Sequence, residues 1–195
     1  MSIREERRAA ALVRMGEHLL REGLAGASLR ALAQAAGTSD RMLLYYFADK
    51  DEILAATLEH IAAQLAGLLD AAGAGAVRRP YPVLLAECAA AFQQPDFQPF
   101  MWLWLEIAAA AARGQEPHRA IAGRIADGFL AWGEARLEEA DPARRAAQAA
   151  LLLATVDGLA LLQAVGRAGP AAEALTAVAP RSAAAAPSGR GRRRS

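Results

Sequence analysis

Apolar residues recur along this chain at the three- and four-residue spacing of amphipathic helices, and no stretch alternates convincingly at the two-residue period of strands. Within residues 4–22, for example, Leu12, Leu19 and Leu20 share one face of a helix. Alanine is abundant and β-branched residues are scarce, which favours helix throughout. The pattern predicts an all-α protein with helices at about 4–22, 28–36, 39–46, 49–70, 82–94, 97–112, 116–139, 142–166 and 170–178.

Capping residues mark several of the expected helix ends. Gly23 stands where a C-terminal cap belongs, and Ser28 can open the next helix with its side-chain oxygen. Asp49, with Glu52 three residues later, resembles a capping box. The glycine- and proline-rich stretch 71–82 is the clearest linker.

The two short helices at 28–36 and 39–46 have the spacing of a helix-turn-helix, because only the tight turn at Gly37-Thr38 joins them. In that motif the second helix enters the major groove of DNA. Leu43 and Phe47, four residues apart, are expected to anchor this helix inward. The candidate DNA-binding residues are Ser28, Arg30, Ser39, Arg41, Met42, Tyr45, Tyr46 and Lys50.

The chemistry of these candidates suits a DNA surface. Arg41 can bond a guanine edge or a phosphate, and Met42 can touch a thymine methyl group. Lys50 can add a further charge near the phosphate backbone. The two tyrosines could instead be core aromatics, but three consecutive helical positions, 45–47, cannot all face one core. We therefore expect Phe47 to point inward and both tyrosines to point outward.

The motif residues follow one another without gaps: Ser28, Leu32-Ala33, Gly37-Thr38-Ser39, Leu43-Leu44-Tyr45-Tyr46-Phe47, Lys50 and Ile53-Leu54. Residues about 8–54 thereby resemble the DNA-binding domain of the TetR family of transcriptional regulators. Leu44 departs from the family pattern, since many members carry a phosphate-binding tyrosine there, and Tyr46 replaces a frequent histidine.

The resemblance implies a three-helix helix-turn-helix domain at 1–48 and a larger helical ligand-binding and dimerisation domain at 49–180. It also implies a ligand-responsive regulator of transcription, a repressor that a small and mainly apolar effector releases from a palindromic operator. The alternative is an all-helical interaction or sensor protein that does not bind DNA.

Aromatic residues gather in the second of these domains, amid alanine. Large rings opposite small residues can leave an apolar cavity, although for any single ring ordinary core packing is the better explanation. Glu106 and His118 could supply polar contacts, or be surface groups. The candidate ligand-binding residues are Phe92, Phe97, Phe100, Met101, Trp102, Trp104, Glu106, His118, Phe129 and Trp132.

Residues 151–165 are apolar almost all round, so a helix there must be covered on two sides. The same helix of a second subunit, packed about a two-fold axis, would cover it, and the alternative is a central core helix in a monomer. A homodimer would also read two DNA half-sites. The candidate interface residues are Val156, Gly158, Leu159 and Leu162.

The formal net charge of +1 conceals an uneven distribution. Residues 1–50 hold 8 basic and 6 acidic residues, and residues 51–180 hold 9 and 15. Residues 181–195 hold 5 arginines and no acid, in a composition that predicts a disordered basic tail. Such a tail would add non-specific attraction to DNA, or only solubility.

No pattern of enzyme chemistry is found. Glu-x-x-His pairs for a di-iron site are absent, and the three histidines lack metal-ligand spacing. Cys88 has no nearby histidine, and is read as a small buried hydrophobe with a redox sensor as the alternative. Phosphate loops and dinucleotide motifs are also missing. We expect no enzyme, no cofactor and no metal.

The start of the chain has no apolar segment of the kind that secretory signals contain. The apolar runs further along are expected to be too short, or too interrupted by charge, to span a bilayer. A single cysteine fits a reducing compartment. These features predict a cytoplasmic protein with no membrane partner.

Overall fold

Across residues 2–74 and 77–178, the part of the chain that this computed structural model describes, the backbone forms nine α-helices and no β-strand. The all-α class predicted from the sequence is confirmed. The helices are α1 (Ile3–Glu22), α2 (Leu29–Ala35), α3 (Asp40–Tyr46), α4 (Lys50–Leu69), α5 (Tyr81–Phe92), α6 (Gln98–Ala112), α7 (His118–Arg136), α8 (Pro142–Ala164) and α9 (Ala168–Val178). Short 3₁₀ turns, η1 (Gly23–Gly26) and η3 (Pro95–Phe97), precede α2 and α6, and a π turn, η2 (Asp70–Ala74), follows α4.

Side-chain caps explain where the N-terminal helices begin. The hydroxyl oxygens of Ser28 and Ser39 accept the backbone N–H groups three residues ahead, at 3.2 and 3.3 Å. Asp49 caps α4 in the same way, but Glu52 accepts the N–H of Ala48 and not that of Asp49. The capping box predicted there is therefore only half formed, because Glu52 reaches one residue further back.

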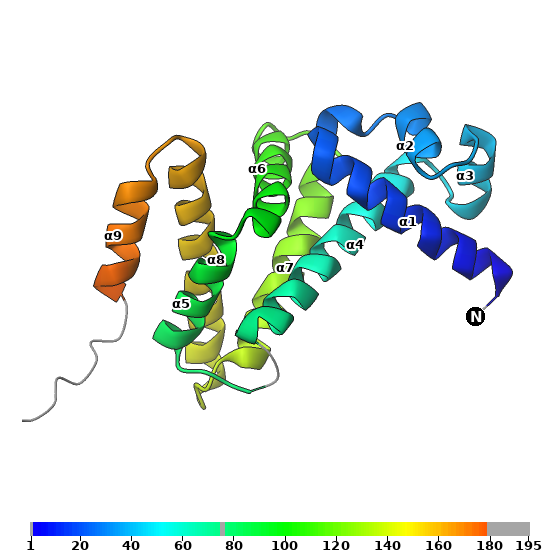
Figure 1. Cartoon of the computed structure of the whole chain (residues 1–195). Helices are drawn as coiled ribbons and strands as arrows, with labels where there is room; N and C mark the ends of the chain where they lie inside the picture. Colours follow the sequence, from blue (N-terminus) through cyan, green and yellow to red (C-terminus); the bar gives the residue numbers. More distant parts are fainter. Residues whose placement is uncertain (1, 75–76, 179–195) are drawn as a thin grey trace, which may run out of the picture.

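Helices α1–α3 form one end of the molecule, and α9 lies at the opposite end (Figure 1). Helix α4 begins beside α3 and runs diagonally into the bundle of α5–α8. The largest buried cluster joins Leu43 of α3 and Ile53 of α4 to Ile107 of α6 and Ile121 of α7. The core thus continues across the domain boundary predicted after residue 48.

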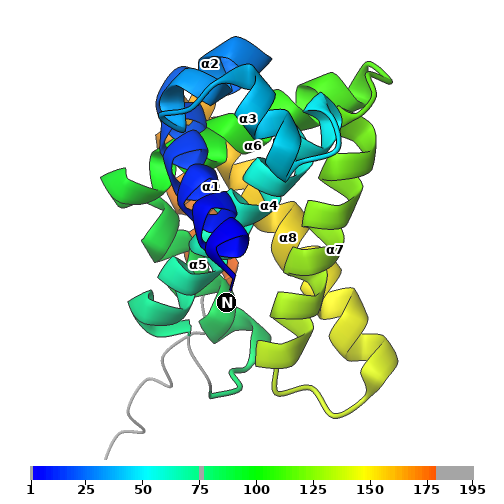
Figure 2. The same cartoon turned by 90° about the vertical axis from the view of Figure 1, so that its right-hand side faces the viewer.

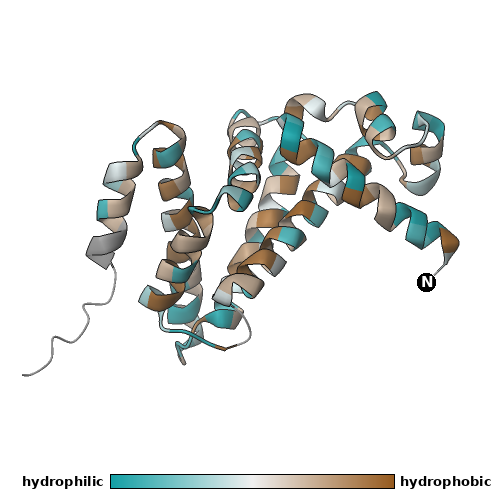
Figure 3. Cartoon of the chain, in the orientation of Figure 1, coloured by the Kyte–Doolittle hydropathy of each residue, from teal (hydrophilic) through white to brown (hydrophobic). Residues whose placement is uncertain are grey.

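Hydrophobic residues follow α4 along its passage through the bundle (Figure 3). Within the described residues, α4 with the following turn and α8 each contain an 18-residue window of membrane-spanning length and composition, with mean hydropathies of 1.2 and 1.5. The expectation that every apolar run is too short or too charged is therefore wrong for these two helices. The core helices of a bundle have the same composition, and Ile53, Leu58 and Ile61 of α4 are buried in this one.

The predicted basic tail, 181–195, lies outside the described residues.

Candidate functional sites

Helix α3 separates its residues between an inward and an outward face, as the sequence predicts. Leu43 is fully buried and Phe47, which follows the last helical residue, is 2% exposed. Arg41 and Met42 are exposed, and Tyr45 is 61% exposed. Figure 2 shows α3 from the outside, beside α1 and α2, with no other element in front of it. A guanidinium, a thioether and a phenol are therefore presented together on one short helix.

Tyr46 departs from the outward position expected for it. Its ring is half-buried and packs against the core cluster, while Tyr45 contacts it edge-on with ring centroids 5.5 Å apart. The reason is helical periodicity: Tyr46 is three residues after Leu43, which fixes the buried face. Only Tyr45 of the two is fully available to a partner.

The remaining candidate DNA contacts are exposed in the first turns of their helices or as caps. Ser28 and Ser39 accept backbone N–H groups, which leaves their hydroxyl protons free to donate to a phosphate oxygen. Arg30 and Lys50 lie exposed in the first turns of α2 and α4.

Two exposed side chains at this surface were not among the predicted contacts. Leu44 is 44% exposed, since it follows Arg41 by three residues and shares its face. Periodicity could have identified it. The Arg4 guanidinium donates to the backbone oxygen of Tyr45 (3.0 Å) and lies over its ring, 5.1 Å from the centroid. No sequence signal links residues 41 positions apart in this way.

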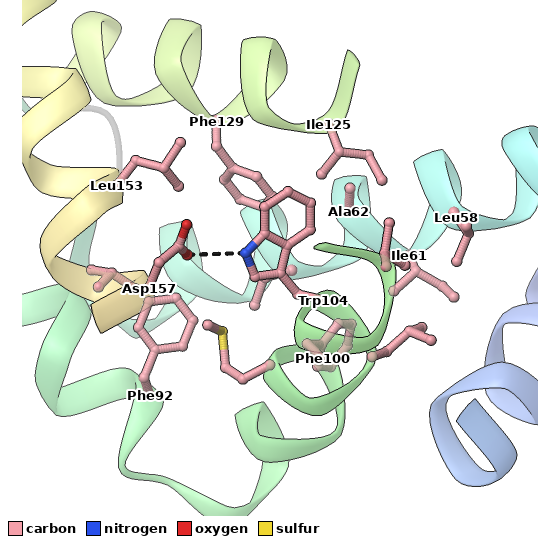
Figure 4. Close-up of a pocket in the computed structure, with 15 residues that line it drawn as sticks. Leu58, Ile61, Ala62, Phe92, Phe100, Trp104, Ile125, Phe129, Leu153 and Asp157 are labelled. Carbon is pink, nitrogen blue, oxygen red and sulfur yellow. Dashed lines mark hydrogen bonds between the residues drawn. The ribbon is translucent and has the colours of Figure 1, made fainter. Parts of the chain in front are cut away.

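A second feature is a small cavity of about 60 Å³ between the helices of the bundle, partly open to the outside (Figure 4). Five of the predicted ligand-binding residues line it: Phe92, Phe100, Met101, Trp104 and Phe129. Helix α4 adds aliphatic side chains, among them Leu58, Ile61 and Leu65, and α8 adds Leu153, Val156 and Asp157. The cavity therefore touches five helices, α4 to α8.

The other predicted ligand-binding residues lie elsewhere. Phe97 is buried beside Leu65 and Leu69, and Trp102 is 37% exposed on the far side of α6. Helical geometry explains this, because Phe100 and Trp104 are four residues apart on the cavity face, whereas residues 102 and 106 share the opposite face.

The remaining three predicted ligand-binding residues, Glu106, His118 and Trp132, also lie outside the cavity lining. The Glu106 carboxylate accepts the backbone N–H of Leu24, at 2.6 Å. His118 begins α7 half-buried, outside the cavity lining. Trp132 donates its indole N–H to Asp70, at 3.1 Å.

Two wider grooves, of about 220 and 260 Å³, lie between α5, α8 and α9 and between α4 and α7. The first contains no ionisable side chain. The second contains Glu59 and Arg124, which neutralise each other in an ion pair of 2.7 Å. The internal cavity is the one that combines the predicted aromatic residues with an unneutralised acid.

That acid is Asp157, which the sequence analysis did not select. Its Oδ1 accepts the indole N–H of Trp104 at 3.1 Å (Figure 4). Burial raises the pKa of Asp157 above its ordinary value of 3.8, and the Trp104 hydrogen bond opposes that shift. A lone carboxylate within the apolar run 151–165 was the signal that could have identified it.

Cys88 is buried in the core of α5 and α8. Burial, with a smaller contribution from the neighbouring Glu87 carboxylate, raises the pKa of the Cys88 thiol to about 12. A thiol that stays protonated at neutral pH is a poor nucleophile, so the structure favours a packing role over the redox alternative.

Helix α8 has one face in the bundle and one face outside. Val156 is only 7% exposed and lines the cavity, so this predicted interface residue points inward. Residues 152, 156 and 160 form the buried face at intervals of four. Leu159 and Leu162 are half-buried, and Gly158 is exposed. The outer face consists of Leu151, Ala154, Gly158, Leu161 and Val165.

The fold and the exposed α3 define a helix-turn-helix protein with a second, helical domain. Residues 17–64 match the family model described as "Bacterial regulatory proteins, tetR family". Over these residues, which include α2, α3 and the first part of α4, the chain is similar to the TetR family. The match begins and ends about ten residues later than the resemblance at 8–54, because it includes more of α4. The family consists of regulators and not of enzymes.

Similar proteins agree with this assignment. The HTH-type transcriptional regulator BetI of Paraburkholderia phytofirmans is 34% identical over 106 residues, which are 54% of each chain. The chain thus spans about half the length of the curated relatives it matches. A solved structure of a TetR-family regulator from Rhodococcus sp. is 19% identical, with a TM-score of 0.70 over 89% of this chain and 96% of that one. The multidrug binding protein EbrR, solved in complex with proflavin, is 25% identical, with a TM-score of 0.61 over 88% and 99%.

Proposed function

We propose that this protein is a ligand-responsive regulator of transcription that binds duplex DNA through α3. The observation that carries the proposal is the division of α3, which exposes Arg41, Met42 and Tyr45 while Leu43 and Phe47 anchor it in the core. Arginine on a guanine edge and an apolar contact to a thymine methyl are established forms of base recognition in the major groove. In this proposal the protein is cytoplasmic, where its DNA is.

The protein acts as a homodimer that reads a palindromic operator. Leu151 and Leu161 are each 54% exposed, and Val165 is 59% exposed, on the outer face of one helix. Exposed apolar residues in one stripe favour an interaction surface. Gly158 lies in the middle of the stripe, with nothing within 4 Å of the position of an added Cβ, so a second backbone can approach closely there.

A small effector in the internal cavity weakens the binding of DNA, so the protein is a repressor that the effector releases. Helix α4 supports this coupling, because it begins next to α3 and lines the cavity about two to four turns later. The solved complex of EbrR with proflavin supports a small-molecule site in a fold of this kind. The effector can act only through a difference in affinity between the two arrangements of the protein.

Selection of DNA from a random pool with the purified full chain tests this function. We expect the selected sequence to be palindromic, and its affinity for the protein to fall steeply as salt is added. The slope of log affinity against log salt concentration should be about −0.9 for each phosphate contact. A helical interaction protein of the alternative kind would select no sequence and would show no such dependence. That result would overturn the proposal.

A further inference from the structure

Asp157 is the only ionisable side chain among the residues that line the internal cavity. The others are aliphatic, aromatic or thioether side chains, and the indole N–H of Trp104 is the one other polar group. Within the described chain, Asp157 takes part in no ion pair with arginine, lysine or histidine. Its single hydrogen bond, from Trp104, leaves the second oxygen, Oδ2, without a hydrogen bond there.

Asp157 is half-buried, so its carboxylate loses part of its hydration, and a nearby positive charge would favour its ionised form. Buried charges are normally paired, and neutral aspartic acid or asparagine would suit an entirely apolar ligand better. The missing partner of Asp157 is therefore a positive charge that the chain itself does not supply. A cationic ligand would supply it.

The aromatic rings around the carboxylate favour the same charge. Phe92, Phe100, Phe129 and Trp104 come from three neighbouring helices and surround the space in front of Asp157 (Figure 4). The faces of such rings carry negative potential and attract ammonium groups, most strongly when water is excluded. Alkyl substituents on the ammonium would in turn contact the aliphatic wall formed by Leu58, Ile61 and Leu65.

The size of the cavity limits the cation. A volume of about 60 Å³ corresponds to roughly four to six water-sized positions at ~10–15 Å³ each. A tertiary or quaternary ammonium head with its methyl groups is of that size. A longer substituent would extend from the cavity, between the helices that enclose it.

We propose that the internal cavity binds the alkylammonium head of an apolar organic cation, with Asp157 as its counter-ion and the four aromatic rings as its enclosure. The proposal rests on the function given above in one respect, since it takes this cavity to be the effector site. It names the chemical class of the effector: cationic at one end and apolar elsewhere.

The test compares two probes of equal shape on the purified full chain without DNA. Benzyltrimethylammonium carries the cation, and neopentylbenzene has a neutral carbon in place of its nitrogen. Binding is measured by isothermal titration calorimetry, with tryptophan fluorescence as a second signal because Trp104 lines the site. We expect the wild type to bind the cation at least about tenfold more tightly than the neutral probe, a difference of ~1.4 kcal/mol.

The variant Asp157→Asn keeps an oxygen for the Trp104 N–H and removes the charge. We expect it to lose about tenfold or more in affinity for the cation and to bind the neutral probe unchanged. The matched control is Asp127→Asn, which makes the same change at an exposed position of α7 and should bind both probes as the wild type does.

Equal affinity of the wild type for the two probes, or no binding of either, would overturn the proposal even if the Asp157→Asn variant failed to fold. Full cation binding by a folded Asp157→Asn variant would also overturn it. The assay contains no DNA, so a failure of operator selection leaves its result intact, and the two proposals fail separately.

Discussion

The Glu106 carboxylate of α6 accepts the backbone N–H of Leu24 in the turn after α1, at 2.6 Å. This hydrogen bond joins the helix that carries Trp104, a cavity residue, to the helical group that positions α3. It offers a second mechanical connection between the two candidate sites, independent of α4. Movement of α6 around a bound ligand would be transmitted to η1 through this contact.

Exchange of the Leu24 amide proton with solvent reports the strength of that contact. Hydrogen bonds to charged groups contribute about 1.5–3 kcal/mol, so Glu106→Ala should accelerate hydrogen exchange of the Leu24 amide by roughly tenfold or more. Glu106→Gln retains an acceptor oxygen and should preserve most of the protection. Unchanged exchange in Glu106→Ala would show that the contact does not hold η1 in solution.

Gly23, next to Leu24, is expected to tolerate no side chain. Its backbone has a φ of +65° and a ψ of −165°, a combination adopted almost only by glycine, and an added Cβ would lie 2.5 Å from Glu106 Oε1. Gly23→Ala should lower the free energy of unfolding by about 1–3 kcal/mol in urea titrations. The control Gly67→Ala, in an open position within α4, should raise it by ~0.5–1 kcal/mol. A neutral Gly23→Ala change would contradict this account.

Loss of the Arg41 guanidinium should weaken DNA binding without affecting the fold. Arg41→Ala is expected to reduce affinity for the selected operator by about ten- to a hundredfold, since a specific arginine contact contributes ~1–3 kcal/mol. Fluorescence anisotropy with a labelled duplex measures the change, and circular dichroism monitors folding. Arg144→Ala removes the same charge from an exposed site on α8 and should have little effect. Equal losses in the two variants would indicate non-specific charge attraction only.

The raised pKa of Asp157 predicts a stability difference that depends on pH. The folded state holds the Asp157 proton more tightly than the unfolded chain, so this residue favours folding below pH 3.8 and loses that effect as the pH rises through the folded-state pKa. Asparagine never ionises. Without ligand, the Asp157→Asn variant should therefore have a melting temperature a few degrees above that of the wild type at pH 7.5. Each kcal/mol added to the free energy of unfolding raises the melting temperature by about 2–4 °C in a protein of this size.

The same difference in melting temperature should shrink as the pH is lowered through the folded-state pKa, and should vanish well below pH 3.8, where the wild-type carboxyl is neutral in both states. Differential scanning fluorimetry over that range checks the trend. Asp127→Asn, at an exposed position, is the control and should show no comparable trend. A destabilised Asp157→Asn protein at pH 7.5 would mean that the ionised form is favoured inside the cavity without a ligand.

The outer face of α8 predicts the oligomeric state. Leu161→Glu places a charge in the middle of the proposed interface and should convert a dimer into monomers of 20.5 kDa in sedimentation experiments. Leu68→Glu makes the same substitution at a 39% exposed position of α4 and should leave the dimer intact. A wild type that is monomeric at micromolar concentration, or a dimeric Leu161→Glu variant, would place the interface elsewhere.

Periodicity and caps were sufficient to predict every helix of the described residues within a few positions, because Ser28 and Asp49 are strong start signals and Gly37 forms a turn with a φ of +70°. The inward positions of Leu43 and Phe47 followed from the same rule. Tyr46 was predicted to point outward because three consecutive helical positions cannot all face one core. It lies instead at the boundary between the two faces, half-buried and packed against the core cluster, because it is three residues from Leu43.

The cavity was harder to predict, because it forms between helices that are far apart in the sequence. Trp104 and Asp157 are 53 residues apart in the sequence, and nothing in the sequence around either residue predicts their hydrogen bond. Aromatic content identified five of the lining residues, yet could not separate Phe100 and Trp104 from Trp102 on the same helix. That separation depends on which face of α6 the bundle covers.

Asp157 and Gly158 are consecutive residues of α8, about 100° apart around the helix axis: Asp157 lines the cavity, and Gly158 lies in the outer stripe. In a two-fold assembly through that stripe, the two cavities would be divided by only a pair of helix backbones. Ligand binding in the cavity of one subunit would then change the ligand affinity of the other subunit through these two helices. The binding curve of the dimer would therefore differ from that of two independent sites.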